Sequence, residues 1–200
     1  MRTLFIMAVM CLFATGIHAQ KIVVEKGKID FLKNEKEVTV KFTYEKMLVG
    51  KMTEEEYIAK KISEGNAKEP GKGDAWFQSW NLDRPTRFEP KFIELFNKQM
   101  EAKGGILMGT QTGGKFLMTV NTHFTEPGFN VGVARKNAAV SLRATITDLE
   151  TGSEIAVISI SNSSANSFSG MDFDVAYRIQ ESYAKAGREL AKFLIKKLKL

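Results

Sequence analysis

The sequence has little of two residue types that active sites and metal sites often use. It contains one cysteine, Cys11, and two histidines, His18 and His123. A single cysteine excludes an internal disulfide, and so few thiols and imidazoles leave little material for a zinc site. The sequence also contains no phosphate-binding loop, no nucleophile elbow and no dinucleotide fingerprint. These absences predict a protein that is not an enzyme and that needs no cofactor and no metal.

Long apolar runs are also missing, except at the start of the chain. Arg2 precedes an unbroken apolar run from Leu4 to Ala14, and the small residue Ala19 follows a few positions later. The run is shorter than the about 20 residues that a permanent membrane helix needs, and the pattern is typical of a secretory signal peptide. We therefore expect residues 1–19 to be removed, leaving a protein without transmembrane segments that is exported to the bacterial periplasm or outer membrane, or secreted.

The charge is only mildly positive, at +6 for the whole chain. The densest lysines, Lys192, Lys196, Lys197 and Lys199, lie near the C-terminus. They are open to two interpretations: a surface for an anionic partner, or cations that complement the dipole of a helix end. We favour the helix end, and the expected export argues against a nucleic-acid partner.

Hydrophobic periodicity indicates one domain over residues 20–200, since no repeat or linker interrupts it. Residues 28–32 suggest a short strand, and alternating apolar residues from Val38 to Tyr44 predict a half-buried one. A helix is expected to start after Thr53, with Glu56 completing a capping box, and to stop at Gly65. A further helix is expected to start near Pro90.

The second half of the sequence is richer in strand patterns. Two apolar stretches, ILMGTQ and FLMTVNTHF, flank TGGK, which predicts a tight reversal at Gly113 and Gly114. Alternation over 140–147 and 155–160 predicts a hairpin that turns at Gly152. Apolar residues at helical spacing from Phe173 to Phe193 then predict a long amphipathic helix. We expect an α+β fold of two layers, with a mixed or antiparallel sheet and helices packed on one face.

The segments ILMGT, VSLRATITDLETGSEI and AKAGRELAKFL occur in the order strand, hairpin and closing helix. Over about residues 88–198 this order resembles the α/β envelope domain shared by the TolB amino-terminal domain, the CsgG-like proteins and the LpoB-type activator lipoproteins. The resemblance implies adaptor or assembly work without an active site. The chain differs from the lipoprotein members because it has no lipobox.

Candidate binding residues lie in the segment DAWFQSWNLDRPTRF, which is rich in aromatic and guanidinium groups. Such groups are enriched in binding hot spots. An alternative is that the two tryptophans, four residues apart, pack into the core. A second candidate segment is the polar loop SNSSANSFSG, which carries one aromatic residue and could equally be a connector. The candidates are Trp76, Phe77, Trp80, Arg84, Arg87 and Phe168.

The sequence therefore predicts a non-catalytic envelope protein that acts as an accessory or adaptor for another envelope protein or a cell-wall polymer. The alternative is a small-molecule, lipid or glycan binder with a cavity between the C-terminal helix and the sheet. A third possibility, a hydrolase using paired carboxylates, is the weakest of the three. If Trp80 contacts a partner, Trp80→Ala should weaken binding and leave the melting temperature nearly unchanged.

Overall fold

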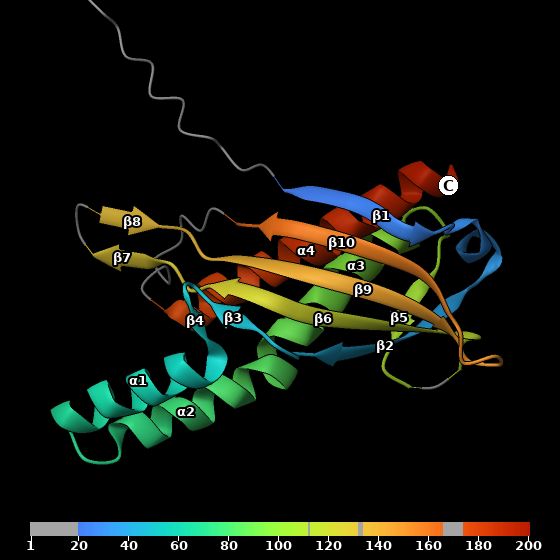
Figure 1. Ribbon diagram of the computed structural model, residues 1–200. Coiled ribbons are helices and arrows are strands. Elements are labelled where there is room, and N and C mark those ends of the chain that lie inside the picture. Colours follow the sequence, from blue (N-terminus) through green and yellow to red (C-terminus); the bar gives the residue numbers. More distant parts are fainter. Residues whose placement is uncertain (1–19, 112, 132–133, 166–173) are drawn as a thin grey trace, which may run out of the picture.

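The computed structural model describes residues 20–111, 113–131, 134–165 and 174–200 (Figure 1). The expected signal peptide and Phe168 lie outside these residues. The strands are β1 (Lys21–Gly27), β2 (Glu37–Thr43), β3 (Leu48–Val49), β4 (Met52–Thr53), β5 (Leu107–Gly109), β6 (Phe116–Glu126), β7 (Phe129–Val131), β8 (Ala134–Lys136), β9 (Ala139–Asp148) and β10 (Glu154–Ser163). The helical elements are η1 (Asp30–Asn34), α1 (Glu54–Lys68), α2 (Lys72–Asp83), η2 (Arg84–Phe88), α3 (Glu89–Glu101) and α4 (Val175–Leu198).

The expected α+β fold with a mixed sheet is confirmed. Eight strands form one sheet in the order β1-β10-β9-β6-β2-β5, with β3 and β4 attached beside β6. Helices α3 and α4 cover one face of this sheet, and β7 and β8 form a separate two-stranded sheet (Figure 1). No helix among the described residues has the length and apolar character to cross a membrane.

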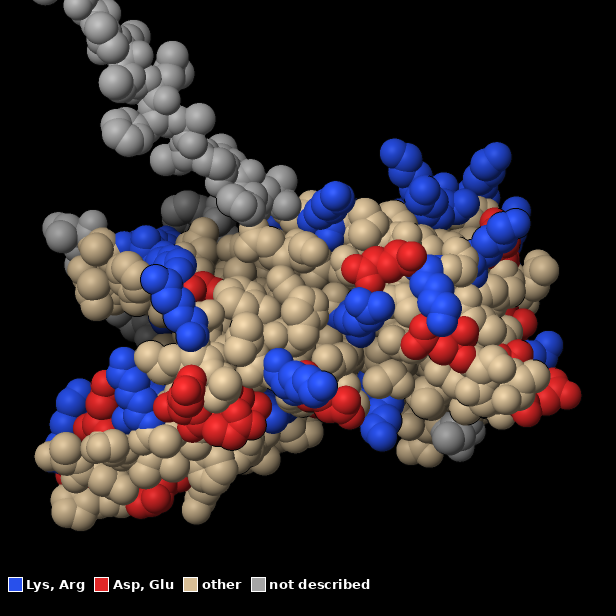
Figure 2. Space-filling view, in the orientation of Figure 1, with Lys and Arg blue, Asp and Glu red and all other residues tan. Residues whose placement is uncertain are grey.

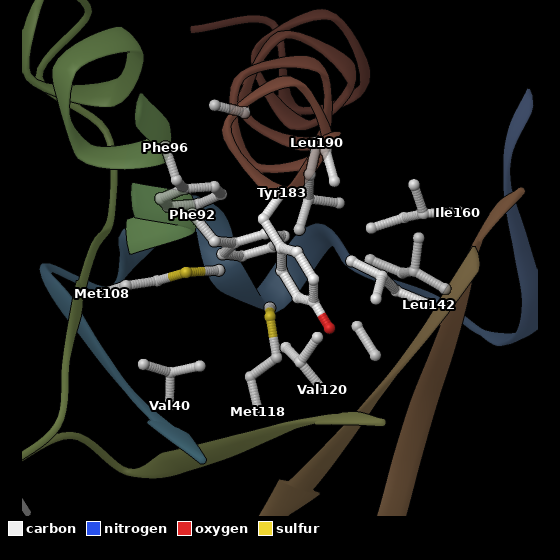
Figure 3. Packing of buried hydrophobic residues seen from close by; sticks show 14 of the residues in the cluster. Val40, Phe92, Phe96, Met108, Met118, Val120, Leu142, Ile160, Tyr183 and Leu190 are labelled. Carbon is white, nitrogen blue, oxygen red and sulfur yellow. The ribbon is translucent and has the colours of Figure 1, made fainter. Parts of the chain in front are cut away.

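The core lies between α3, α4 and the sheet. The backbones of the two helices approach closely because α4 has Gly187 at their contact, where a Cβ atom would lie 2.1 Å from the carbonyl oxygen of Phe92. Figure 3 shows large side chains from both helices meeting those of the strands: Phe92, Phe96, Tyr183, Leu190, Val120 and Leu142. The Tyr183 hydroxyl makes a buried 2.6 Å hydrogen bond with Thr122 Oγ1.

The hairpin of β9 and β10 and the helix α4 form as the sequence predicts. Alternate residues of β9, including Leu142, Ala144 and Ile146, are fully buried beneath the helices. The turn uses Gly152 at φ +71, and the Asp148 carboxylate accepts hydrogen bonds from the backbone of Glu150 and Thr151. Periodicity was sufficient here because each element buries one continuous face.

Two expected elements are wrong. The segment 28–32 is not a strand, because most of it belongs to the 3₁₀ turn η1, which inserts Ile29 and Leu32 into the core. The TGGK segment does not close a hairpin, since β5 and β6 both run parallel to β2 on its opposite sides. The chain therefore crosses from one side of β2 to the other. Gly114 is needed for close approach, because a Cβ there would lie 2.6 Å from the carbonyl oxygen of Glu37.

Helix α1 begins as expected and ends later than expected. The Thr53 side chain accepts from the Glu56 backbone, and the Glu56 carboxylate accepts from the Thr53 backbone, which completes the capping box. The helix continues through Gly65 to Lys68. Gly65 serves packing instead, since a Cβ there would lie 2.6 Å from the Cα of Gly73 in α2.

Candidate partner-binding end

Helices α1 and α2 form a helical hairpin that projects from one end of the sheet (Figure 1). Their backbones meet near the tip, where a Cβ on Gly73 would lie 2.1 Å from the carbonyl oxygen of Ile62. The Asn66 side chain accepts from the Gly73 backbone at 2.8 Å and donates to Asp74 at 3.1 Å. No residue of α1 is fully buried. Near its tip the hairpin is therefore held by close backbone contact and a few polar groups.

The predicted tryptophans lie where α1 and α2 pack together. Trp76 and Trp80 stack at 5.5 Å between ring centroids, and Tyr57 of α1 contacts both rings at 5.8 and 5.4 Å. Trp80 is only 6% exposed and belongs to the core, whereas Trp76 and Phe77 are partly exposed. The alternative in which Trp80 packs inward thus describes its position, and its indole supports the hairpin from inside.

A polar cluster joins the base of this hairpin to the sheet. This joint cluster consists of Tyr44, Glu54, Trp80, Arg84 and Glu89. The Glu54 carboxylate accepts from Trp80 Nε1 at 2.7 Å and pairs with the Arg84 guanidinium, which lies over the Tyr44 ring at 4.0 Å. The Tyr44 hydroxyl donates to Glu89 at 3.0 Å. Arg84 is thus already engaged by the fold.

Burial dominates the electrostatics of the joint cluster. It raises the pKa of Glu89, and the hydrogen bond from Tyr44 and the charge of Arg84 oppose this rise without cancelling it. Burial also raises the pKa of Tyr44 and of the neighbouring Tyr183, so both hydroxyls stay protonated. A carboxyl group with a raised pKa can act as an acid, but Glu89 is held by packed neighbours. This favours a structural role for Glu89.

Arg87 connects the same region to α4. Its guanidinium donates to Gln180 at 3.2 Å and to Asp174, the N-cap residue of α4, at 3.1 Å, and it also contacts Asp83 at 3.5 Å. Burial raises the pKa of Asp83, with Arg87 opposing the rise. The structure therefore connects Trp76, Trp80 and Arg84 through ring stacking and the Glu54 carboxylate. Arg87 instead joins this region to α4, and Phe77 lies partly exposed on α2.

A second feature projects from the same end of the molecule. Strands β7 and β8, residues 129–131 and 134–136, form a two-stranded arm beyond the end of β6 and β9 (Figure 1). The Glu126 carboxylate fixes its base by accepting from the Gly128 backbone at 3.0 Å and pairing with Lys136. Buried Arg178 of α4 donates to the carbonyls of Pro127 and Gly128. The base is thus anchored, while the arm itself extends away from the sheet.

Exposed apolar side chains gather at this projecting end. Phe129 and Val131 of the arm are 43% and 65% exposed, and Leu48 of β3 is 46% exposed. Leu149, which is 47% exposed, lies instead in the turn between β9 and β10 at the opposite end (Figure 1). Large apolar groups that remain in water at one end of a molecule are typical of an interaction surface.

Several carboxylates that could serve a hydrolase have partners that explain them. Asp148 stabilises a turn, Asp174 caps α4, and Glu154 pairs with Lys26 at 2.8 Å. Among the described residues, no group of three or more histidine, cysteine or acidic side chains could hold a metal ion.

The molecule also has a depression between the edge strand β1 and α4. Its volume is about 540 Å³, within the range of small-ligand sites. It includes Lys185, Lys192 and Lys196, which share one stripe of α4. In the view of Figure 2, Lys and Arg side chains gather near the C-terminal part of α4.

Sequence reasoning missed the arm, and it considered Lys192 and Lys196 of the stripe as a surface for an anionic partner but favoured a helix end. The arm has a signal, because apolar residues alternate at Phe129, Val131 and Val133. The stripe also has one, because Lys185, Lys192 and Lys196 recur at helical spacing within the long amphipathic helix.

No family model matches the chain, and no curated protein matches it significantly. Among solved structures it is similar to PelC from Paraburkholderia phytofirmans, described as a dodecamer, with 10% identity, 84% of this chain and 98% of that chain covered, and a TM-score of 0.39. It is also similar to a DUF330 protein from Xanthomonas campestris, with 8% identity, 88% and 94% covered, and a TM-score of 0.41. At these values neither neighbour identifies what this chain does.

Proposed function

We propose that the protein is a non-catalytic, exported accessory or adaptor protein that binds another envelope protein or a cell-wall polymer through its projecting end. The observation that carries the proposal is the β7–β8 arm, which holds Phe129 and Val131 in water on a clamped base. Among the described strands β7 and β8 pair only with each other, so Phe129 and Val131 can pack against a partner. Its exposed apolar side chains suit a protein or polymer better than a small substrate.

The envelope location comes from the expected signal peptide and from the resemblance to envelope adaptor domains, both of which stay predictions. The projecting end supports the same kind of work. The joint cluster holds the helical hairpin, and Glu126 and Arg178 hold the arm, so both features are presented in a defined orientation. Preorganisation of this kind lowers the entropic cost of binding.

The test is affinity capture from a native envelope extract with matched variants. The double variant Phe129→Asp with Val131→Asp places charges on the arm, and we expect retention of the bound protein or polymer to fall by about tenfold or more. Leu149→Asp makes the same kind of change at an exposed apolar position at the opposite end, and should retain the partner as the wild type does. Quantitative mass spectrometry and glycan analysis of the eluates measure both.

The proposal fails if the double variant, shown by circular dichroism and melting temperature to be folded, retains the same partners as the wild type. It also fails if Leu149→Asp causes an equal loss, because binding would then not depend on the projecting end.

A second candidate function is a small-molecule, lipid or glycan binder. The depression between β1 and α4 favours it, since it lies between the C-terminal helix and the edge of the sheet. The two functions use different surfaces of the molecule and can coexist.

A further inference from the structure

The depression between β1 and α4 combines excess positive charge with a small apolar wall. Helix α4 contributes Lys185, Glu189, Lys192 and Lys196, and these residues recur every three or four positions, so their side chains share one face. Three ammonium groups and one carboxylate give a formal charge of 3 − 1 = +2. An anionic ligand would therefore be attracted to this site.

The internal contacts of these groups leave much of that charge uncompensated. The Glu189 carboxylate accepts from Lys192 at 2.9 Å and from Arg188 at 3.3 Å. Burial alone would raise the pKa of Glu189, but these hydrogen bonds and charges outweigh it and hold the pKa below its usual range. Lys185 donates only to a neutral carbonyl, that of Ser164, at 2.7 Å. Within the described part of the chain, Lys196 forms no hydrogen bond or ion pair.

The apolar part of the wall is small and includes a ring. Ile22 of β1 and Phe193 of α4 line the depression, and both pack against the core. Two such side chains cannot enclose an acyl chain, which needs a cavity lined mostly by apolar groups. An aromatic face can, however, pack against the C–H groups of a ring of sugar size.

Gln20 supplies an independent observation at the same site. Gln20 lines the depression, and neither polar atom of its side-chain amide has a hydrogen-bond partner in the described structure. An amide carries donors and an acceptor, so a ligand that both donates and accepts hydrogen bonds can pair with it. Sugar hydroxyl groups do both.

We infer that the depression between β1 and α4 binds an acidic sugar, that is, a sugar ring carrying a carboxylate or phosphate group. The anionic group contacts Lys196, the ring packs on Phe193, and hydroxyl groups bond to the Gln20 amide. The inference rests on the second candidate function and specifies its ligand class.

The experiment measures binding to the purified protein by isothermal titration calorimetry at low salt. The probes are galacturonic acid trisaccharide, glucose 6-phosphate, the neutral sugar maltotriose and a short-chain phosphatidic acid. The first two distinguish a carboxylate from a phosphate source. We expect at least one acidic sugar to bind, and we expect no binding of maltotriose or of the lipid.

Charge variants locate the site. Lys196→Glu should weaken binding by about tenfold or more, because it reverses a charge beside the ligand. Lys60→Glu makes the same change on α1 at the far end of the molecule and should leave binding within about twofold, since salt screens distant surface charges. Glu189→Gln should strengthen binding by about threefold, because it removes the carboxylate that holds Lys192.

Four results would overturn the inference. Absence of binding by both acidic sugars at millimolar concentration rejects an acidic-sugar site. Binding of maltotriose or the lipid as tightly as the acidic sugars rejects the ligand class, while the second candidate function would still stand. Equal losses for Lys196→Glu and Lys60→Glu would mean that overall charge, and no defined site, accounts for binding. Weaker binding by Glu189→Gln would contradict the role of the lysines.

Discussion

Two helix pairs in this molecule approach each other in the same way and have very different support. In the sheet body, Gly187 of α4 lies against the Phe92 carbonyl, and in the projecting hairpin, Gly73 of α2 lies against the Ile62 carbonyl. The first contact is covered by a core in which Phe92, Phe96 and Leu190 have no exposed surface. The second lies in a hairpin whose first helix buries no residue fully. The contact at Gly187 should therefore stabilise the whole fold, whereas the contact at Gly73 should stabilise only the helical hairpin.

Trp80→Ala removes the side chain that connects the helical hairpin to the joint cluster, and it should have the largest effect on stability. It removes a 6% exposed indole, its stacking on Trp76 and its hydrogen bond to Glu54. We expect a loss of about 4 kcal/mol in the free energy of unfolding, measured by urea denaturation. The expectation from sequence of a nearly unchanged melting temperature is thereby replaced. A variant as stable as the wild type would place Trp80 outside the structural core.

Gly187→Ala tests the contact between α3 and α4 above the sheet. Helix propensity alone would favour alanine by about 1 kcal/mol, but the new Cβ would lie 2.1 Å from the Phe92 oxygen. The helices must separate above the sheet, and we expect a net loss of about 3 kcal/mol in the free energy of unfolding. Native-state hydrogen exchange should show faster exchange throughout α3, α4 and the strands beneath them.

Gly73→Ala is the matched change in the hairpin, with the same 2.1 Å approach to a carbonyl oxygen, that of Ile62. We expect hydrogen exchange to increase in α1 and α2 and the global free energy of unfolding to fall by less than about 1 kcal/mol. If both glycine variants lower global stability equally, the helical hairpin unfolds in the same cooperative unit as α3, α4 and the sheet. The expected difference between the two glycine contacts would then be wrong.

Glu89→Gln should have the smallest effect on stability, and the size of this effect should depend on pH. Because burial raises the pKa of Glu89, the folded state prefers its protonated form, and the stability gained from protonation is lost as pH rises through the folded-state pKa. The melting temperature of the variant relative to wild type should therefore increase from about pH 4 to about pH 7. Glu94→Gln, at an exposed position on the same helix, should leave the wild-type pH profile unchanged.

The sequence could predict the elements whose burial follows a single period. Buried residues alternate along β9, at Leu142, Ala144 and Ile146. Along α4 they follow one face, at Ile179, Tyr183 and Leu190. The spacing of apolar residues alone therefore indicates which side of each element is buried. The hairpin turn at Gly152 and the capping box at Thr53 are equally local. These features determine the α+β class and the layer order.

Non-local contacts could not be predicted in this way. In the sequence Gly65 looks like a helix stop, yet it is a glycine because the backbone of Gly73 approaches it. Gly114 looks like a turn residue, yet it is a glycine because the backbone of Glu37 approaches it. For the candidate site, composition indicated the segment 74–88 without showing how its side chains are held. Trp80 and Arg84 carry the residue types of a binding surface, but Glu54, distant in sequence, binds both of them.

The pairing of the first strands has a consequence for how the chain is made. Lys21 of β1 pairs opposite Ser161, and β2 pairs only with β5 and β6, so every neighbour of these two strands is encoded after them. A chain synthesised from its N-terminus therefore carries β2 without these partners until β5 and β6 have emerged, and β1 without its partner until β10 has emerged. Such late pairing slows folding and exposes strand edges to other chains. Newly made protein should accordingly depend on a chaperone until its last hairpin is complete.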